Sequence, residues 1–382
     1  VGSSALGTAD CGNENTAVGK DALKIFTGGS ATVVGSMAAV AATNAGYLTA
    51  VGYNAAGALI GGTGNTSVGA FSLYTNLTTG NYNTAVGHAA GQDVYGGSNT
   101  LIGRYAGIYA SNTNSCIAIG NTALAGPAPA TVTCTLVAIG DATVTCSSTD
   151  RIDVGHYLTG TGVPAGTTVA SINAGTGGAS VTSFEMSAVA TANGSQSLKF
   201  WANVGDNNIA IGHNTMDAIT TGTRNVAIGS GSTTTLSSGD DTVAIGHDAL
   251  SAFTGSNATA VGSGAMDAAT SAGYSTAVGM SALGAVIDGV SNTAVGVSSM
   301  GLLTDTHYNT AMGHGSGYSC DGTSNVYLGY NAGFYATTAD HCIAIGRGAL
   351  EAADTAGDDS DNATGDYNIA IGSYALDATT SG

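Results

Sequence analysis

Four histidines occupy the same place in a recurring phrase, directly after the glycine of a Val-Gly, Ile-Gly or Met-Gly pair: His88, His213, His247 and His314. If three chains met around an axis near one such position, three imidazoles could gather into a metal site. Elsewhere in the chain the same position holds Ser, Lys, Asn, Tyr or Arg. We therefore expect an ordinary surface position and no metal site.

The carboxylates give no clear catalytic pattern. The stretch GDDSDNATGD, 357–366, is loosely similar to a calcium loop but lacks a complete ligand spacing, so we expect a solvated turn, with Ca²⁺ as the alternative. Glu14, Glu185 and Glu351 are scattered, and no Ser-His-Asp order, nucleophile elbow or phosphate loop stands out. We expect no enzyme and no cofactor. A glycan-cleaving enzyme, which needs two carboxylates in a groove, remains the alternative.

Aromatic residues gather late in each half of the chain. An exposed tyrosine could stack on a sugar ring, whereas packing inside the chain or between chains is the alternative explanation. A glycan or protein receptor on a host surface is therefore a candidate partner. The candidate binding residues are Tyr105, Tyr109, Tyr330, Phe334 and Tyr335.

Composition limits the class of protein. The chain has 382 residues with 60 Gly, 6 Phe and 1 Trp, so large side chains cannot fill its interior. The chain has 7 Lys and Arg but 25 Asp and Glu, which gives a net charge of −18. This charge argues against binding to nucleic acid or to an anionic membrane. No run of 18 apolar residues is present, so we expect no membrane insertion in this segment.

A short phrase repeats along most of the chain with a spacing of 16 to 18 residues, which is typical of a solenoid. The sequence also begins in mid-repeat and without Met, so we expect it to be a piece of a longer chain. The glycine of the phrase recurs at Gly2, Gly19, Gly35, Gly52, Gly69, Gly87, Gly103 and Gly120, then at Gly212, Gly229, Gly246, Gly262, Gly279, Gly296, Gly313, Gly329, Gly346 and Gly372.

The columns of the repeat predict a short strand before each glycine. The residue before it is aliphatic, as in Val18, Val86 and Ile228, and the residue two earlier is β-branched, which puts both on one strand face. Between them Ala stands in 13 of 17 coils. Because a wet face would carry polar residues, we expect this Ala face to be closed by another layer or by another chain.

Two further columns have structural roles. Asn stands four residues before the glycine in 10 of 17 coils, as in Asn15, Asn83, Asn225 and Asn309, and stacked amides can hydrogen-bond along such a column. The glycines, such as Gly19, Gly87 and Gly229, permit a turn where a Cβ would clash. Three and four residues later, pairs such as Ala-Leu are expected to point inward.

A longer duplication divides the chain. Residues 19–120 match residues 246–346 coil for coil, and 205–222 match 365–382, but the bridge between the matched parts is much longer in the first copy. We therefore predict a first β-roll unit over 1–126, an inserted sandwich-like β module over 127–204 and a second β-roll unit over 205–382. VAIG at 137–140 fits a hairpin of the module better than another coil, and YLTGTGVPAGTTVASI predicts two strands joined by a turn.

The phrases NTAVG, NVAIG and NIAIG resemble the head repeats of trimeric autotransporter adhesins and similar repeats of phage tail-fibre-like proteins. The resemblance implies a trimeric, left-handed parallel β-roll. It covers nearly all of the chain outside the insert, whose VGHYLTGTGVPAGTTVASI is similar to a β module of phage virion proteins. The coils here are longer than is usual for the adhesin heads, and the segment has no coiled-coil stalk or membrane anchor.

The cysteines bear on where the chain folds. Cys134 and Cys146 lie near facing positions of the predicted hairpin and could pair, whereas Cys116 and Cys342 are too many coils apart to reach each other. Cys11 and Cys320 have no visible partner. Such usage is typical of folding in a reducing cytosol, which favours a phage over an autotransporter.

Together these features predict an all-β, parallel β-solenoid that acts as a structural fibre segment and displays host-recognition modules. A phage tail fibre or related virion appendage, located outside the cell, is the leading expectation. The alternative is a bacterial cell-surface adhesin or a self-assembling extracellular filament. The chain itself, as homotrimer or filament, is the expected partner.

Overall fold

The computed structural model describes residues 1–7, 12–74, 80–126, 128, 130–136, 138–146, 157–164, 167–173, 183–192, 194–201, 204–351 and 365–377. Within these residues all regular structure is β, and no helix is present. The chain divides into two compact units. The first unit comprises Val1–Asn207 with Ile219–Thr221, and the second comprises Asn208–Ala218 with Gly222–Gly382.

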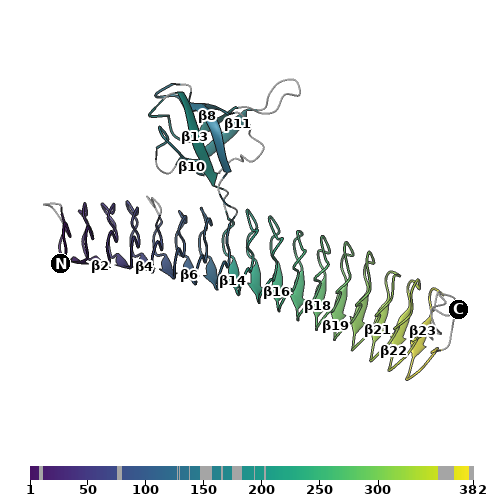
Figure 1. Cartoon of the computed structure of the whole chain (residues 1–382). Helices are drawn as coiled ribbons and strands as arrows, with labels where there is room; N and C mark the ends of the chain where they lie inside the picture. Colours follow the sequence, from purple (N-terminus) through teal and green to yellow (C-terminus); the bar gives the residue numbers. More distant parts are fainter. Residues whose placement is uncertain are drawn as a thin grey trace. The chain divides into compact units, whose positions relative to one another are not determined.

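Each coil contributes one strand of three residues, and successive strands of a unit pair in parallel and in register, as at Thr276↔Thr293 and Ala277↔Ala294. Figure 1 shows these strands side by side within each unit. The parallel β-solenoid predicted from the spacing is confirmed. In the first unit the strands are β1 (Thr16–Val18), β2 (Thr32–Val34), β3 (Thr49–Val51), β4 (Thr66–Val68), β5 (Thr84–Val86), β6 (Thr100–Ile102) and β7 (Ile117–Ile119). In the second unit they are β14 (Ile209–Ile211), β15 (Val226–Ile228), β16 (Val243–Ile245), β17 (Thr259–Val261), β18 (Thr276–Val278), β19 (Thr293–Val295), β20 (Thr310–Met312), β21 (Val326–Leu328), β22 (Ile343–Ile345) and β23 (Ile369–Ile371).

The two faces of these strands are the reverse of the prediction. The central Ala is the inward residue: Ala50, Ala85 and Ala277 are fully buried within their own chain. The aliphatic residue after it points outward, and 41% of Val18 and 36% of Val86 are exposed. The Ala face is therefore closely packed, as expected, but against the second wall of its own coil instead of another chain. The physical reason is the narrow interior of the coil: the second wall supplies the larger side chains, and in most coils this leaves room for only a small residue on the strand.

The second wall of the coil supplies the larger core residues. In the coils between the first and the last, the small residue and the Leu or Met that follow the glycine by three and four positions are completely buried, as in Ala249-Leu250 and Ala265-Met266. This confirms the inward pair. Leu250 and Met266 adopt φ values of 52°, in the left-handed region, where residues other than glycine are uncommon.

Two strands carry a large residue in place of the inward Ala, and glycines make room for it. Tyr327 in β21 is fully buried, and a Cβ added at Gly317 would lie 2.7 Å from its Cδ2. A Cβ added at Gly333 would overlap the other side of the ring. Leu101 in β6 has the same arrangement with Gly91 and Gly107, where an added Cβ would lie 2.6 and 2.7 Å away. In these coils the large side chain on the strand thus fills the space that a side chain of the second wall would otherwise occupy.

Replacing Tyr327 by alanine is expected to lower the free energy of unfolding by about 3–5 kcal/mol, because Gly317 and Gly333 leave the cavity unfilled. Replacing Gly333 by alanine in the Tyr327→Ala chain should restore part of that loss. Urea unfolding followed by circular dichroism measures both. Equal stability of the wild type and Tyr327→Ala would contradict this packing.

The repeat glycines behave as predicted. Gly19, Gly87 and Gly229 have φ values of 132°, 137° and 135°, a backbone conformation that L side chains rarely adopt. A Cβ added at Gly229 would lie 2.6 Å from the carbonyl carbon of Gly246 in the next coil. Both the backbone conformation and the close approach of neighbouring coils therefore require glycine in this column.

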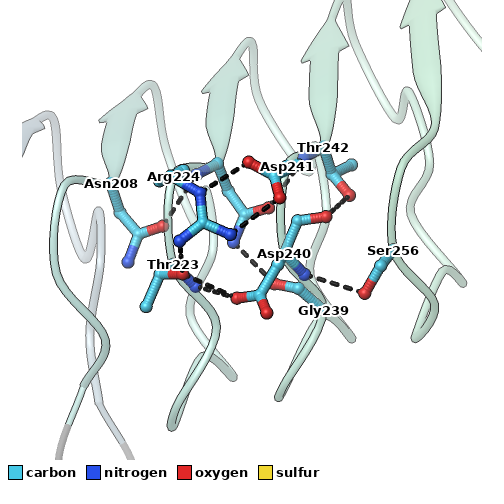
Figure 2. Close-up of polar contacts among 9 residues, drawn as sticks. Asn208, Thr223, Arg224, Gly239, Asp240, Asp241, Thr242 and Ser256 are labelled. Atoms are coloured by element: carbon cyan, nitrogen blue, oxygen red, sulfur yellow. Dashed lines mark hydrogen bonds and ion pairs between the residues drawn. The ribbon is translucent and has the colours of Figure 1, made fainter.

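The Asn column joins the coils, but mainly through the backbone. The Asn225 N–H donates to Oδ1 of Asn208 at 3.0 Å, and its Nδ2 donates to the Gly239 carbonyl at 2.7 Å. Figure 2 labels the two partners, Asn208 and Gly239. The Thr242 N–H in turn donates to Oδ1 of Asn225 at 3.0 Å. Asn15, Asn83 and Asn309 are bonded in the same way, to the backbone of the following coil.

A direct amide-to-amide bond of the kind expected joins Asn99 Nδ2 to Asn83 Oδ1 at 3.0 Å. The predicted amide ladder is thus largely a side-chain-to-backbone ladder. It satisfies buried N–H and C=O groups that the three-residue strands leave unpaired.

A second column of polar side chains bonds the coils at the corner before the strand. Oδ1 of Asp240 accepts the Thr223 N–H at 2.6 Å, and the Asp240 N–H donates to Oγ of Ser256 at 2.9 Å (Figure 2). Beside it, Arg224 forms a two-point ion pair with Asp241, with nitrogen–oxygen distances of 2.6 and 2.7 Å. The hydrogen bond from Arg224 holds the pKa of the Asp241 carboxyl below its usual value.

The predicted inserted module contains the antiparallel part of the fold. Its strands form one sheet in the order β10-β13-β8-β9-β12-β11, so the predicted sandwich-like module has its described strands in one sheet instead of two. The strands are β8 (Ala130–Leu136), β9 (Thr143–Cys146), β10 (Tyr157–Thr159), β11 (Val169–Asn173), β12 (Ser183–Met186) and β13 (Gly194–Trp201).

One of the two strand pairings predicted for this module is present in the sheet, and the other is not. β8 and β9 pair in an antiparallel hairpin, with Leu136 opposite Val144, which confirms a hairpin rather than a coil around VAIG. The two strands of YLTGTGVPAGTTVASI, β10 and β11, are present but lie at opposite edges of the sheet. β10 pairs with β13 and β11 pairs with β12. The module has its own core, which includes Leu136, Val144, Phe184 and Leu198.

Cys134 and Cys146 face each other in this hairpin, with Cα atoms 4.0 Å apart, and form a disulfide. Reduction is expected to destabilise the module by about 2–3 kcal/mol, since the closed loop is short. Hydrogen exchange of β8 and β9 at increasing urea concentration can follow unfolding of the module with and without reductant. A Cys134→Ser/Cys146→Ser chain should be insensitive to reductant. If its midpoint equals that of the oxidised wild type, the disulfide does not stabilise the module.

The other described cysteines are buried thiols of the solenoid: Cys116, Cys320 and Cys342. Cys320 Sγ lies 3.0 Å from the Tyr327 hydroxyl, and burial raises the pKa of this thiol to about 11. Cys116 and Cys342 each donate from Sγ to a backbone carbonyl, of Gly205 and Gly365 respectively. Cys11 lies outside the described residues.

Alkaline conditions should therefore weaken the solenoid. An unfolded thiol ionises near pH 8.5, whereas folded Cys320 keeps its proton to about pH 11, so stability is complete below pH 8.5 and is lost as pH rises to 11. We expect a loss of about 3 kcal/mol over this range. Urea unfolding at pH 8 and pH 11 measures it. The fall should be smaller in Cys320→Ala, and an equal fall in both chains would contradict the assignment to this thiol.

Candidate functional site

The outward strand face, which we define as the first and third residues of each solenoid strand, is an uncharged surface that continues from coil to coil within each unit. In the first unit the first row is Thr in six strands, from Thr16 to Thr100, and the second row is Val or Ile. In the second unit the third residue is Ile, Val, Met or Leu throughout. Val278 and Met312, for example, are 37% and 48% exposed. The predicted structural residues Val18, Val86 and Ile228 all belong to this face.

Exposed tyrosines stand two residues before several of these strands. They share a left-handed backbone conformation, and Tyr274, at 73%, is the most exposed of them. These residues were missed in the sequence, where the signal that could have revealed them is the column five residues before the repeat glycine. Tyrosine is enriched in protein interfaces. The residues are Tyr47, Tyr82, Tyr274, Tyr308 and Tyr367.

A chain of ring contacts crosses successive coils of the first unit. Phe71 contacts Tyr53, Tyr74 and His88 with ring centroids 5.4, 5.5 and 6.1 Å apart. His88 then contacts Tyr105 at 5.5 Å. The Arg104 guanidinium lies 4.5 Å from the centre of the Tyr105 ring, and its Nη2 is 3.3 Å from the Tyr105 hydroxyl. Tyr105, one of the predicted binding residues, is therefore part of a larger group.

Two of the aromatic groups in the second unit contain the predicted binding residues. In one, His314 stacks on Tyr330 at 5.4 Å, and Arg347 lies 5.8 Å from the Tyr330 ring and 5.3 Å from the Tyr374 ring. In the other, Phe334 stacks on Tyr318 at 4.7 Å and meets Tyr335 edge-on at 4.7 Å.

These contacts divide the predicted binding residues among separate groups. Tyr105 belongs to the first unit's ring chain, Tyr330 to the histidine–arginine group, and Phe334 and Tyr335 to the other. Tyr109 is half-buried in the first unit.

The residues considered for metal or acid–base chemistry lie apart. His88, His213, His247 and His314 are all exposed. Among the residues that the structure describes, no three His, Cys, Asp or Glu side chains gather as metal ligands. Of the Asp-rich stretch, 357–364 lie outside the described residues, and Asp366 Oδ1 accepts the Asp340 N–H at 2.9 Å. Glu14, Glu185 and Glu351 lie near Ser30, Thr143 and Asn331 respectively.

The fold and its faces define the class of protein as a parallel β-solenoid that carries a small antiparallel β module. Comparison of the chain with protein-family models, curated proteins and solved structures gives no match. Across the described ranges, no helix is long and apolar enough to span a lipid bilayer.

Proposed function

We propose that this chain is a self-associating structural fibre segment, with copies packed through the outward strand face. The observation that carries the proposal is the composition of that face. It consists of Thr, Val, Ile, Met and Leu in a chain whose net charge is −18. Monomeric proteins rarely expose long apolar patches, and those that do generally use them for association.

Self-association fits this face better than another partner does. The interior of each coil is already filled by its own Ala, Leu and Met residues, so a second chain has no role inside. Outside, the rows are uniform from coil to coil, so two copies can meet with the same residues opposed at every level. The resemblance of NTAVG and NIAIG to trimeric β-roll repeats makes three copies the expected number.

The biological role that follows is extension and display. A fibre of stacked coils holds the antiparallel module and the aromatic groups away from its point of attachment. We propose a phage tail fibre or related virion appendage, located outside the cell, with a host-surface glycan or protein as receptor. A bacterial cell-surface adhesin or a self-assembling extracellular filament is the second candidate, because the repeat also resembles the head repeats of trimeric autotransporter adhesins.

Native mass spectrometry and sedimentation of the whole chain at several concentrations test the proposal. The expected mass is three times 36.9 kDa and does not change with dilution. Electron microscopy should then show thin fibre segments. A monodisperse single chain over the same concentrations would overturn the fibre assignment.

A further inference from the structure

Each unit holds a histidine, a tyrosine and an arginine in contact, within two successive coils of the first unit and three successive coils of the second. His88 and His314 are equivalent positions of the duplication, directly after Gly87 and Gly313. In the first unit His88 meets Tyr105, and Tyr105 meets Arg104. In the second unit His314 meets Tyr330, and Tyr330 meets Arg347, which comes from the following coil. Different positions therefore produce the same group of side chains twice. We call these the His–Tyr–Arg clusters.

The arginines of the clusters differ from the third described arginine. Arg224 is bound to Asp241 through two nitrogen–oxygen contacts. Arg104 and Arg347 are exposed, and in the part of the chain that the structure describes neither has a carboxylate partner. In a chain with 25 acidic and 7 basic residues, two guanidinium groups without a carboxylate partner, both on aromatic rings, mark local sites for an anion.

We propose that each His–Tyr–Arg cluster binds a carboxylated sugar unit of a glycan. The face of a pyranose ring packs on the tyrosine ring, which is 51% exposed in Tyr330 and half-buried in Tyr105, and the sugar carboxylate takes the two-point hydrogen bond that a guanidinium offers. The Arg104 side chain is held in place by its stacking on Tyr105, which reduces the entropy lost on binding. The histidine ring adds a donor beside the sugar hydroxyls. This inference draws on the proposed function only in placing the chain at a host surface.

A glycan fits better than other anionic polymers. Nucleic acid binding depends on many basic contacts, whereas each cluster offers one arginine on a chain of net charge −18. A sugar carboxylate requires a single guanidinium. Both uronic acids of capsules and sialic acids of cell surfaces carry this group.

Binding of a linear galacturonic acid octamer to the whole chain, measured by isothermal titration calorimetry, tests the proposal. The methyl ester of the same octamer is the matched ligand without charge. We expect the free acid to bind at least about tenfold more tightly than the ester. Comparing sialyllactose with lactose repeats the test for sialic acid in place of a uronic acid. The acid that binds more tightly identifies which of the two sugars the clusters prefer.

Variants identify the residues involved. Arg104→Gln/Arg347→Gln should weaken binding of the acid about tenfold or more, and Tyr105→Leu/Tyr330→Leu should do the same. Arg224→Gln, which removes a paired arginine, and Tyr274→Leu, which removes an exposed tyrosine of another column, should leave affinity within about twofold. The circular dichroism and mass of each variant confirm that it folds and associates like the wild type.

The outcomes separate this inference from the proposed function. Three results would contradict saccharide binding by the His–Tyr–Arg clusters, whatever the mass of the chain. They are no binding of either acid, equal affinity for the acid and the ester, and a loss of affinity in Arg224→Gln equal to that in the cluster variants. Tight binding of a single-stranded oligonucleotide of equal charge would also contradict saccharide binding. If the chain is a monomer that binds the acid, and the cluster variants lose this binding, the proposed fibre is wrong but the binding site at the clusters is supported.

Discussion

Gly52→Ala is expected to lower the free energy of unfolding by at least about 3 kcal/mol and to disrupt the coils on either side of it. Gly52 has a φ of 136°, which an alanine adopts only with strain. Its Cβ would also lie 2.7 Å from the carbonyl carbon and oxygen of Gly69 in the next coil. Because each coil contacts mainly its neighbours, the damage should be local at first. Urea unfolding gives the energy, and hydrogen exchange locates the loosened coils.

Gly46 provides the matched control six residues away. It is not among the glycines with a positive φ, and the nearest atom to an added Cβ is Thr63 Oγ1 at 3.9 Å. Gly46→Ala should therefore change the free energy of unfolding by less than about 1 kcal/mol. Similar losses in both variants would mean that neither the backbone conformation nor the close approach of the next coil makes the repeat glycine necessary.

Adjacent residues of β18 should respond in opposite ways to the same substitution. Ala277→Asp would place a carboxylate without a partner in the filled interior of the coil, at a cost of about 4 kcal/mol or more. Val278→Asp would place it on the outward strand face, where the side chain is already 37% exposed. The fold of the single chain should then survive with a change below about 1 kcal/mol, whereas association of copies should be lost.

Circular dichroism and light scattering of the two variants separate these effects. We expect Ala277→Asp to lose β structure and Val278→Asp to keep it with a lower mass. If Val278→Asp unfolds and Ala277→Asp does not, the assignment of inward and outward faces is wrong. An unchanged mass of folded Val278→Asp would instead exclude the outward strand face at this level from the contact.

Much of the architecture was accessible from the sequence because the repeat constrains it directly. The spacing of the glycines predicts the coil, and the inward pair such as Ala249-Leu250 follows from its constant chemistry. The orientation of the strand was not accessible in this way. The alternation in Thr-Ala-Val defines two strand faces but does not say which face points into the coil. The general preference for burying large aliphatic residues favours the Val face, which is the outward one. The width of the coil, set by residues such as Leu250 on the opposite wall, decides it.

The candidate sites were predictable only in part. Aromatic residues visibly gather in the sequence, but their contacts depend on which column each occupies, so Tyr330 and Phe334 belong to separate groups although they are four residues apart. The sequence shows the two glycines near Tyr327 but does not explain them. The structure explains them, because the Tyr327 ring lies between them. In the module, the hairpin was predictable from local pattern, whereas the separation of β10 from β11 arises from pairing with distant strands.

The central claim is that the outward strand face joins copies of this chain. The most direct measurement is multi-angle light scattering of the whole chain beside a variant with Val261, Val278 and Val295 replaced by lysine, which puts three like charges in adjacent coils of that face. The account predicts a mass of three chains for the wild type and one chain for the variant, with the same circular dichroism. A wild-type chain that is monomeric, or a folded variant that keeps the mass of three, would contradict it.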